Sequence, residues 1–580
     1  MSSELRLDGA KLFALVFLLG LVAPLTIPRS ASPAPRAYLQ IFCQQFSPED
    51  SAIPAGTLRS LKSPRKKEAR DPQGDLWRVS PEGLTQITAD GRTKVWSGRE
   101  GLPARRVLGV SSGADGRVWV SAADGVVAMN PQAAPRDRWF CFRGRRYLRD
   151  DSVENLVAED GGAWVRTRTG ISHIEFKPFD LEQKSALFLR RVEQRHNRHG
   201  YVADCDLLRP GDLSSHRPVP SDNDGLWTSL YVASECFRYG ATHSPEALQN
   251  ARASLGALRR LESITGIPGF PARTLIHRGD YRDQGGEWHF TPDGEWEWKG
   301  DTSSDELVGH FFAYATAYDL LPDESDRRAI TPVVSRIASH LLDHGMKLVG
   351  YGGRVTRWGN YSPEYFLTRE GEEEAPLSSL ELLSHLKVAY HVTQEEKFNA
   401  AYERLITELG YASNVSRLAT EAPAEVNYSD EELAFLSFYP LLRLEDNPTL
   451  RGHYVEALKG LWQRVRPEHN PLWNFIYAAS TGDLDYGRDD AVDTLEGIPL
   501  DTISWTVKNS DRADLDIPSQ RGRFGEKQAR QAIASNERAV MKWNGNPFEL
   551  DGGNSGRSED DGVFYLLPYW MGRYHGIILL

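Results

Sequence analysis

Between Asp222 and the C-terminus the sequence repeats one pattern, in which an acidic cluster is followed directly by an aromatic-rich apolar helix. The period of 3.6 residues predicts five helix pairs and one last helix. In a ring of paired helices the inner helices run parallel, so their N-termini meet at one end and would gather the acidic groups around one cavity. The clearest acidic clusters lie at 222–224, 301–306, 428–432 and 559–561.

The apolar residues divide these helices into two kinds. One helix of a pair has a single apolar stripe with charges elsewhere, as in 323–345, which is typical of an outer helix. Its partner is apolar nearly all round, as in 376–393, and is expected to be buried on both sides. We therefore predict an α/α toroid over residues 181–580. The expected pairs are 224–241 with 244–264, 303–321 with 323–345, 376–393 with 394–410, 430–444 with 448–466, and 470–481 with 487–498, and the last helix is 562–577.

A different repeat precedes the helices. A Gly-turn, a short alternating strand that contains a tryptophan and a second Gly-turn occur three times, around Trp77, Trp119 and Trp164. The tryptophans are 42 and then 45 residues apart. A period in the forties is typical of propeller blades, and a closed propeller needs at least four of them. Residues 72–180 are therefore expected to form about three blades, and residues 37–71 a linker.

These segments resemble the repeats of the two-component-regulator propeller family, whose motif runs roughly as Asp-x-x-Gly-x-Leu-Trp followed by a Gly-Leu turn. The helical region resembles the six-hairpin toroids of many glycoside hydrolases, polysaccharide lyases and sugar epimerases, without indicating one family. The expected fold class is a multidomain α+β chain, in which a small propeller-like module precedes a toroid of five to six helical hairpins. An architectural resemblance cannot by itself supply a function.

The first residues indicate export. Arg6 and Lys11, the apolar run 12–27 and a small-residue exit make 1–36 a signal peptide or an uncleaved signal anchor, the one expected contact with a membrane. The net charge of -12 disfavours nucleic acid as a partner. Four cysteines allow up to two disulfides, but their spacing fixes no pairing and excludes a zinc knuckle. Nothing in the sequence indicates the oligomeric state.

Several acidic clusters contain more carboxylates than helix capping needs, and the surplus suggests a catalytic site. We expect Glu306 to be a general acid, because His310 follows it by one turn and the helix can bury it. Asp430 or Glu431 is the expected base, and Asp305 and Asp561 would position substrate hydroxyls. The competing interpretation is that these acids cap helices and that Glu306 and His310, like Glu381 and His385, are structural pairs.

The long segments between helices supply expected substrate contacts, because an aromatic ring can stack on a sugar while an amide bonds its edge. The residues expected to bind substrate are Trp227, Arg278, Trp298, His310, Asn360, Tyr361, His385, Tyr428 and Trp543. No cofactor and no metal ligand set are expected. The run Asp222-Asn223-Asp224-Gly225 leaves calcium open, although the other ligands of an EF-hand are missing.

The leading hypothesis is an exported carbohydrate-active enzyme, a glycoside hydrolase that acts on an oligo- or polysaccharide. One carboxyl would protonate the glycosidic oxygen while another activates water. A polysaccharide lyase is the alternative enzyme, with Tyr428, His310, Asn360 and Arg278 as its candidates. A non-catalytic binding protein, with the blades and the rim of the toroid as its surface, is the third hypothesis.

Overall fold

The protein was analysed as a computed structural model, which describes residues 37–283, 285–418, 426–483, 486–539, 542 and 544–579. The expected export segment 1–36 and Trp543 lie outside the described residues. Within the described part of the chain, no helix is both long and apolar enough to cross a membrane.

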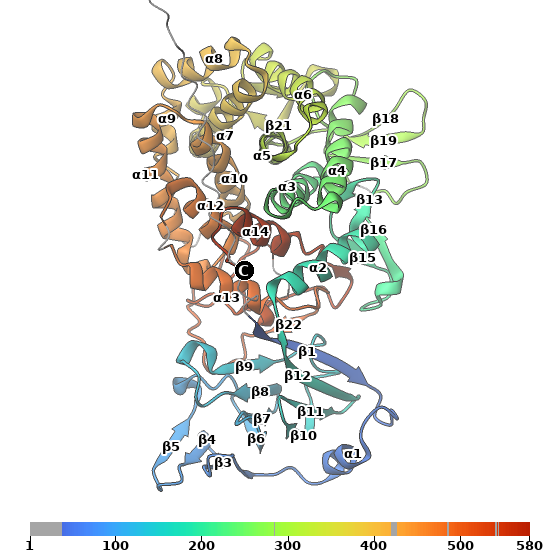
Figure 1. Ribbon diagram of the computed structural model, residues 1–580, viewed down its shortest axis with the longest axis vertical. Coiled ribbons are helices and arrows are strands. Elements are labelled where there is room, and N and C mark those ends of the chain that lie inside the picture. The colour runs from blue at the N-terminus through green and yellow to red at the C-terminus, as the bar shows by residue number, and fades with distance from the viewer. Residues whose placement is uncertain are drawn as a thin grey trace, which may run out of the picture.

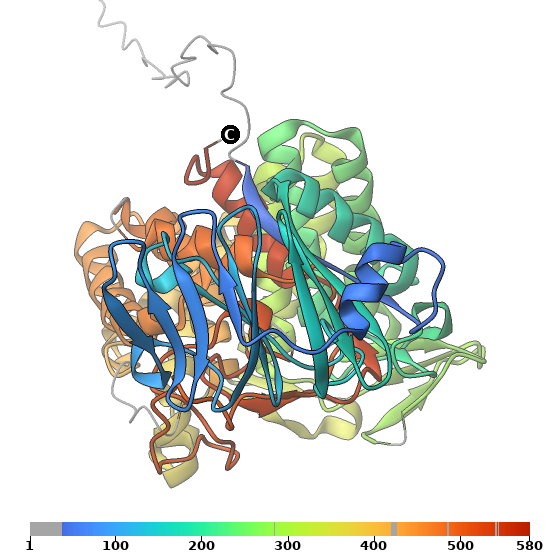
Figure 2. The ribbon, with the colours of Figure 1, turned by 90° about the horizontal axis from the view of Figure 1, so that it is seen from below.

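The N-terminal part forms three four-stranded antiparallel sheets, which lie side by side beneath the helices (Figure 2). The first sheet contains β2 (Glu68–Arg70), β3 (Leu76–Ser80), β4 (Gly83–Ile87) and β5 (Thr93–Trp96). The second contains β6 (Val107–Ser112), β7 (Val118–Ala122), β8 (Gly125–Met129) and β9 (Trp139–Phe142). The third contains β10 (Val153–Glu159), β11 (Gly162–Thr167), β12 (Ile171–Phe179) and β1 (Tyr38–Phe46).

The sequence repeat corresponds to these sheets. Trp77, Trp119 and Trp164 each lie on the second strand of a sheet, and all three are buried. Gly83 and Gly125 begin the third strands of the first two sheets with φ near +140°, where a Cβ atom would overlap a carbonyl oxygen of the neighbouring strand. The described residues form three such sheets, one fewer than the smallest closed propeller needs.

The segment 37–71, expected to be a linker, is part of the sheets. Its strand β1 pairs residue for residue with β12, so that Tyr38 faces Phe179 and Phe46 faces Ile171. The segment also supplies α1 (Ala55–Lys62) and β2. Most of β1 is only half-buried, and its sequence YLQIFCQQF lacks the strict alternation that would have revealed a strand.

Six inner helices contact one another in a closed ring, which Figure 1 shows along its axis. Their order around the ring is the order of the chain, and the last helix packs against the first. They are α3 (Asp224–Thr242), α5 (Ser304–Leu320), α7 (Arg369–Thr393), α10 (Tyr428–Leu444), α12 (Pro471–Thr481) and α14 (Val563–Tyr574).

Each inner helix has an outer partner. Five partners follow their inner helix directly: α4 (Pro245–Ile264), α6 (Glu324–Asp343), α8 (Glu396–Thr407), α11 (Pro448–Val465) and α13 (Arg488–Gly497). The sixth, α2 (Leu181–Arg191), packs on α14 although it opens the helical region. A short helix, α9 (Tyr411–Val415), lies against α7. The predicted helix pairs are thus found close to their expected bounds, and the ring has six of them.

The segments that lead into the inner helices carry the remaining strands. Because the inner helices are parallel, these segments gather at one end of the ring, here called the mouth. The strands are β13 (Asn197–Arg198), β14 (Tyr201–Val202), β15 (Cys205–Leu207), β16 (His216–Pro218), β17 (Thr274–His277), β18 (Trp288–Phe290), β19 (Trp296–Lys299), β20 (Lys347–Val349), β21 (Val355–Asn360), β22 (Val507–Lys508), β23 (Asp551–Gly552) and β24 (Ser558–Glu559).

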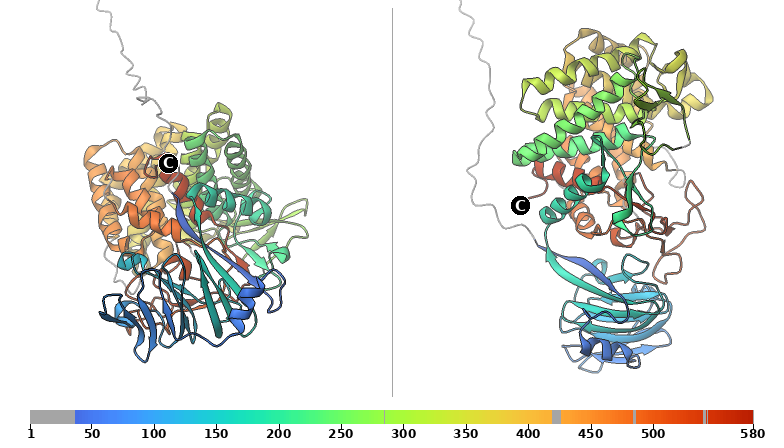
Figure 3. Two further views of the ribbon diagram at one scale, coloured as in Figure 1. Left: turned by 60° about the horizontal axis from the view of Figure 1, so that its bottom comes forward. Right: turned by 90° about the vertical axis from the view of Figure 1, so that its right-hand side faces the viewer.

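The sheets and the ring are joined in two ways. Strand β12 runs directly into α2, whose first turn is capped by the Asp180 carboxylate through the backbone N–H of Gln183. The segment 499–561 leaves the ring after α13, touches the sheets and returns to the mouth before α14 (Figure 3). The four cysteines are all unpaired.

Candidate active site at the mouth of the ring

Two carboxyl groups, each from a different inner helix, interact electrostatically with Glu381 of a third inner helix. Glu381 lies on α7, while Asp305 lies in the first turn of α5 and Asp430 in the first turn of α10. Burial raises the pKa of Glu381 well above its usual range, and the charges of Asp305 and Asp430 raise it further. Glu381 is 1% exposed, whereas the other two are half-buried. Two carboxyls that reach the surface therefore interact with a buried carboxyl whose environment favours the protonated form.

Tyr361, expected to bind substrate, lies beside this group. Its ring is 1% exposed, and burial together with Glu381 and Asp305 raises the pKa of its hydroxyl well above the usual range. A neutral phenol beside Glu381 can donate a hydrogen bond to it, which lowers the pKa of the carboxyl in opposition to burial. Tyr361 thus belongs to the wall behind the three carboxyls.

Glu306 points away from this group, toward α3. The helices α3 and α5 pack so closely that a Cβ atom on Gly225 would overlap the Glu306 carboxylate. Glu306 is fully buried, and neither of its oxygens has a hydrogen-bond partner among the described residues. Burial raises its pKa well above the usual range, as do the charges of Asp224 and Asp305, while Arg273 opposes them. The expected general acid is therefore protonated but closed off from solvent.

The expected pairing of Glu306 with His310 does not form a hydrogen bond. The His310 ring is fully buried, and its Nδ1 lies 3.2 Å from the Tyr314 hydroxyl. Burial lowers its pKa to about 3, so the imidazole is neutral. His385, the corresponding residue on α7, stacks on Phe311 at 4.3 Å, and burial lowers its pKa to about 3 as well. Both histidines are packed inside the ring and neither faces a substrate.

Glu431 belongs to a different cluster from its neighbour Asp430. Its carboxylate lies 3.2 Å from the Arg464 guanidinium on α11 and interacts with Glu468. Burial and the Glu431 charge raise the pKa of Glu468 well above its usual range. The cluster lies between α10 and the segment that joins α11 to α12. Adjacent residues on a helix point about 100° apart, which explains why only one of the two expected bases faces Glu381.

Asp561 takes part in a second acidic group at the mouth. Its Oδ1 accepts the backbone N–H of Val563 at 2.8 Å and so caps α14. One oxygen each of Asp204, Asp560 and Asp561 lie within 4.8 Å of one another. The Lys542 ammonium forms an ion pair with Asp204 and lies 4.0 Å from Asp560. Burial and Asp204 raise the pKa of Asp560 well above its usual range, while the nearby Lys542 opposes them.

The expected substrate residue Trp227 adjoins this second group. It lies on α3, is half-buried, and has the Lys542 ammonium 5.2 Å from its ring centroid. Sequence reasoning assigned roles to Asp561 and Trp227, whereas it gave no individual role to Asp560, a member of the acidic cluster 559–561, to Lys542 or to Asp204. The sequence around Asp204 gave little indication of a site residue. Asp204 precedes β15 and comes together with Asp560 only through the pairing of β15 with β24.

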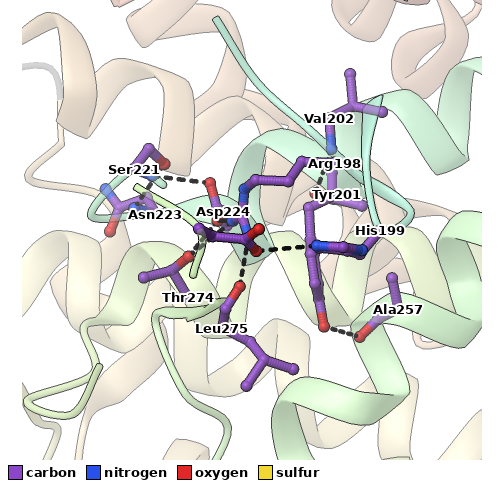
Figure 4. A network of polar contacts seen from close by, with 12 residues as sticks. Arg198, His199, Tyr201, Val202, Ser221, Asn223, Asp224, Ala257, Thr274 and Leu275 are labelled. Atoms are coloured by element: carbon purple, nitrogen blue, oxygen red, sulfur yellow. Dashed lines mark hydrogen bonds and ion pairs between the residues drawn. The ribbon is translucent and has the colours of Figure 1, made fainter. Parts of the chain in front are cut away.

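The two carboxylates of the possible calcium loop are both held by cations of the chain. Figure 4 shows that Asp224 bonds Arg198, Thr274 and the backbone N–H of Ser221. Asp222 forms an ion pair with Lys299. The segment is a structural junction before α3, and its carboxylates are not arranged as a calcium loop.

A pocket of about 510 Å³ lies among the segments that lead into α3, α5 and α7. Tyr351 and Trp358, 57% and 45% exposed, form its aromatic part. Cations and carboxylates alternate on its walls, and Lys299 bridges Asp222 and Asp283. The charged residues that line it are Asp222, Asp283, Glu287, Asp301, Arg273, Lys299, Arg354 and Arg357.

The other expected substrate residues are scattered. Arg278 is exposed beyond β17 and does not line the pocket. Trp298 is 3% exposed and packs against the tilted ring of His289, with the ring centroids 4.3 Å apart. Asn360 accepts hydrogen bonds from Ser362 and shapes the turn after β21. The Tyr428 hydroxyl donates to Asn546 at 2.9 Å, and burial raises its pKa far above the usual range.

Comparisons with known proteins give no family. No family model matches the chain, and no curated protein matches it. Among solved structures, a family 76 glycoside hydrolase from a bovine Bacteroides thetaiotaomicron strain is 9% identical with a TM-score of 0.37, over 82% of this chain and 98% of that one. A sugar epimerase from a ruminal bacterium is 10% identical with a TM-score of 0.36, over 68% and 97%.

A third solved structure matches a smaller share of the chain. The extracellular domain of a hybrid two-component system from B. thetaiotaomicron is 20% identical with a TM-score of 0.17, over 20% of this chain. This chain spans 16% of the length of that domain. All three similarities are too remote to carry an argument, so the function has to be argued from the residues themselves.

Proposed function

We propose that the chain is a carbohydrate-active enzyme, a glycoside hydrolase whose acid and base lie at the mouth of the helical ring. The observation that carries the proposal is the convergence of Asp305, Glu381 and Asp430 from three inner helices. Glycoside hydrolysis needs one protonated and one ionised carboxyl on either side of the scissile bond. Because Asp305 and Asp430 both interact with the buried Glu381, whose pKa is raised, the three carboxyls can share a proton among themselves while another of them acts as a base.

The two half-buried carboxyls, Asp305 and Asp430, are the groups that can touch a substrate. We assign the proton donor and the base to them, and we assign the buried Glu381 to holding a proton between them. This revises the sequence-based choice of Glu306, which is closed off against α3. Asp305 takes a direct role in place of the positioning role expected for it, and Asp430 keeps the role of base.

The pocket beside the mouth supports a sugar as the substrate class. Exposed aromatic rings such as Trp358 can stack on the apolar face of a sugar ring. The alternating carboxylates and cations of the pocket can bond hydroxyl groups at its edges. The expected export signal would place such an enzyme where polysaccharides are found, and the N-terminal blades would support the mouth.

The lyase alternative is less well supported. Its expected base Tyr428 has a pKa raised far above the usual range, and its hydroxyl donates a hydrogen bond to Asn546. Of its other candidates, His310 lies in the core, Arg278 lies on an exposed loop, and the side-chain oxygen of Asn360 accepts hydrogen bonds from Ser362. A proton abstraction beside a uronate needs these groups to meet, and they lie in different parts of the domain.

The test is a polysaccharide panel read by two assays. Release of reducing ends without ultraviolet absorbance from an unsaturated product is expected, because a hydrolase forms no double bond. Asp305→Asn and Asp430→Asn should each lower turnover roughly 10²- to 10⁴-fold. Asp446→Asn is the matched control, since its side chain is 96% exposed just beyond the opposite end of α10. Normal turnover in both mouth variants would overturn the assignment.

A further inference from the structure

A histidine, a cysteine and a glutamate meet inside the protein where the two ends of the helical region join. Strand β15 pairs with β24 so that Cys205 lies opposite Glu559, 354 residues away in the sequence. His196 ends the helical turn that follows α2. At most 1% of each of the three residues is exposed. The described residues thus bring three potential metal ligands into one enclosed place.

The distances between the ligand atoms suit a shared ion. His196 Nε2 lies 3.3 Å and Cys205 Sγ lies 4.0 Å from the same oxygen, Glu559 Oε2. Zinc binds nitrogen, oxygen and sulfur at about 2.0 to 2.3 Å in tetrahedral geometry, which places two ligand atoms roughly 3.3 to 3.8 Å apart. The observed separations are those of an open tetrahedral site to within a few tenths of an ångström.

The orientation of His196 is the second, independent observation. Its Nδ1 lies 3.0 Å from the carbonyl oxygen of Ala203, which fixes the ring and leaves Nε2 as the free ligand atom. Nε2 has no hydrogen-bond partner among the described residues, although Glu559 Oε2 lies 3.3 Å from it. The ring nitrogen therefore faces the space between the three groups and is not aligned with the carboxylate.

We propose that His196, Cys205 and Glu559 bind one zinc ion that ties the segment before α3 to the segment before α14. Zn²⁺ is favoured because it accepts a thiolate, an imidazole and a carboxylate together. The fourth position is left for a water molecule. The bound ion closes the ring of helices at the point where its first and last parts meet.

Proton release accompanies binding. Zinc binds a thiolate and a neutral imidazole, so any proton on Cys205 or on the ligating nitrogen of His196 is released when the ion binds. Arg195 makes two hydrogen bonds to Glu559, at 2.5 and 2.8 Å, and orients that carboxylate. Zinc affinity is therefore expected to rise with pH.

The test measures bound zinc on the full chain. The protein is incubated with zinc chloride and dialysed, and zinc is then counted by mass spectrometry. One zinc per chain is expected in the wild type and in the control variant Cys43→Ser, whose thiol lies on β1 outside the site. Cys205→Ser and His196→Ala are expected to lose it. The wild-type melting temperature is expected to fall when a strong chelator removes the ion.

Cobalt substitution keeps the proposal testable if the variants fail to fold. A thiolate bound to Co²⁺ gives a near-ultraviolet charge-transfer band, and this band is expected in wild-type protein loaded with cobalt chloride. Absence of the band together with absence of bound zinc would overturn the proposal, leaving a plain His196–Glu559 ion pair. Equal zinc in Cys205→Ser and wild type would overturn it as well.

Discussion

The guanidinium of Arg146 donates a hydrogen bond to the carbonyl oxygen of Ala539 at 2.6 Å, across 393 residues of sequence. The same side chain, which lies between β9 and β10, also reaches the carbonyl oxygens of Asp501, Ile503 and Arg538. One buried arginine of the sheets therefore holds the segment that carries Lys542 and Asp560 to the mouth. The sheets therefore help to hold the residues of the mouth in place.

Replacing Arg146 by methionine should keep most of the packing but leave several buried carbonyl oxygens without a donor. The free energy of unfolding is expected to fall by at least about 2 kcal/mol, since each unsatisfied buried group costs about 1 to 3 kcal/mol. Urea unfolding measures the change. Arg149→Met, which changes an exposed arginine of the same segment, is the control and should be nearly neutral. Equal stability of both variants would contradict the structural role.

Two inner helices approach each other so closely at Gly309 that one added methyl group is expected to lower the stability of the protein. A Cβ atom on Gly309 of α5 would lie 2.7 Å from the Leu226 Cα of α3, so Gly309→Ala must push the helices apart. We expect a loss of about 1 to 3 kcal/mol from overpacking. Gly256→Ala on the outer helix α4 meets no atom within 4 Å and should instead stabilise the protein by roughly 0.5 to 1 kcal/mol. Thermal melts of the two variants should shift in opposite directions.

His385 is expected to be replaceable by phenylalanine. Its ring stacks on Phe311, and neither of its nitrogens has a hydrogen-bond partner among the described residues. Removing two buried polar atoms that lack partners should leave stability unchanged or raise it by about 1 kcal/mol. Turnover should also stay near the wild-type value, because the ring does not face the mouth. Loss of activity without loss of stability would instead favour the substrate-binding role expected from the sequence.

Two buried glutamates make stability depend on pH. Burial raises the pKa of Glu306 and of Glu381 in the folded protein, so their stabilising contribution is complete below the unfolded pKa of about 4.5. That contribution is lost as pH rises toward the folded pKa, at about 1.4 kcal/mol per pH unit for each proton. Glu306→Gln removes one such group.

The measurement is the melting temperature between about pH 5 and 8. The wild type should lose stability with rising pH more steeply than Glu306→Gln. Glu324→Gln on α6, where the side chain is 66% exposed, should keep the wild-type slope. Identical slopes in all three proteins would show that Glu306 is ionised in the folded state.

The periodicity of the sequence predicted most of the secondary structure. Helices α3 to α14 lie near their expected bounds because long apolar stripes leave little freedom in assigning a helix. The spacing of Trp77, Trp119 and Trp164 likewise located the three sheets, since each sheet repeats one buried position on its second strand. Strand β1 was not predicted, because its sequence has no clear alternation of apolar and polar residues and its partner β12 comes more than a hundred residues later.

Which residues face the mouth depends on how each inner helix is rotated about its own axis, and no local sequence pattern records that rotation. Asp305 and Glu306 are neighbours in the sequence, yet Asp305 acts on Glu381 while Glu306 is packed against Gly225 of α3. A helix turns by about 100° per residue, so its rotation about its own axis decides which acid faces the mouth. That rotation is set by the neighbouring helices, above all by the close packing of Gly309 on Leu226.

The sequence by itself determined most of the helices and the strands that carry Trp77, Trp119 and Trp164, and it indicated that acidic groups collect at one end of the inner helices, because periodicity and parallel packing are local consequences of residue order. Only the tertiary structure decided that α2 is the outer partner of α14, that Cys205 faces Glu559, and that Glu381 is the carboxyl between Asp305 and Asp430. These relationships join residues far apart in the chain, and side-chain packing across the closed ring fixes them.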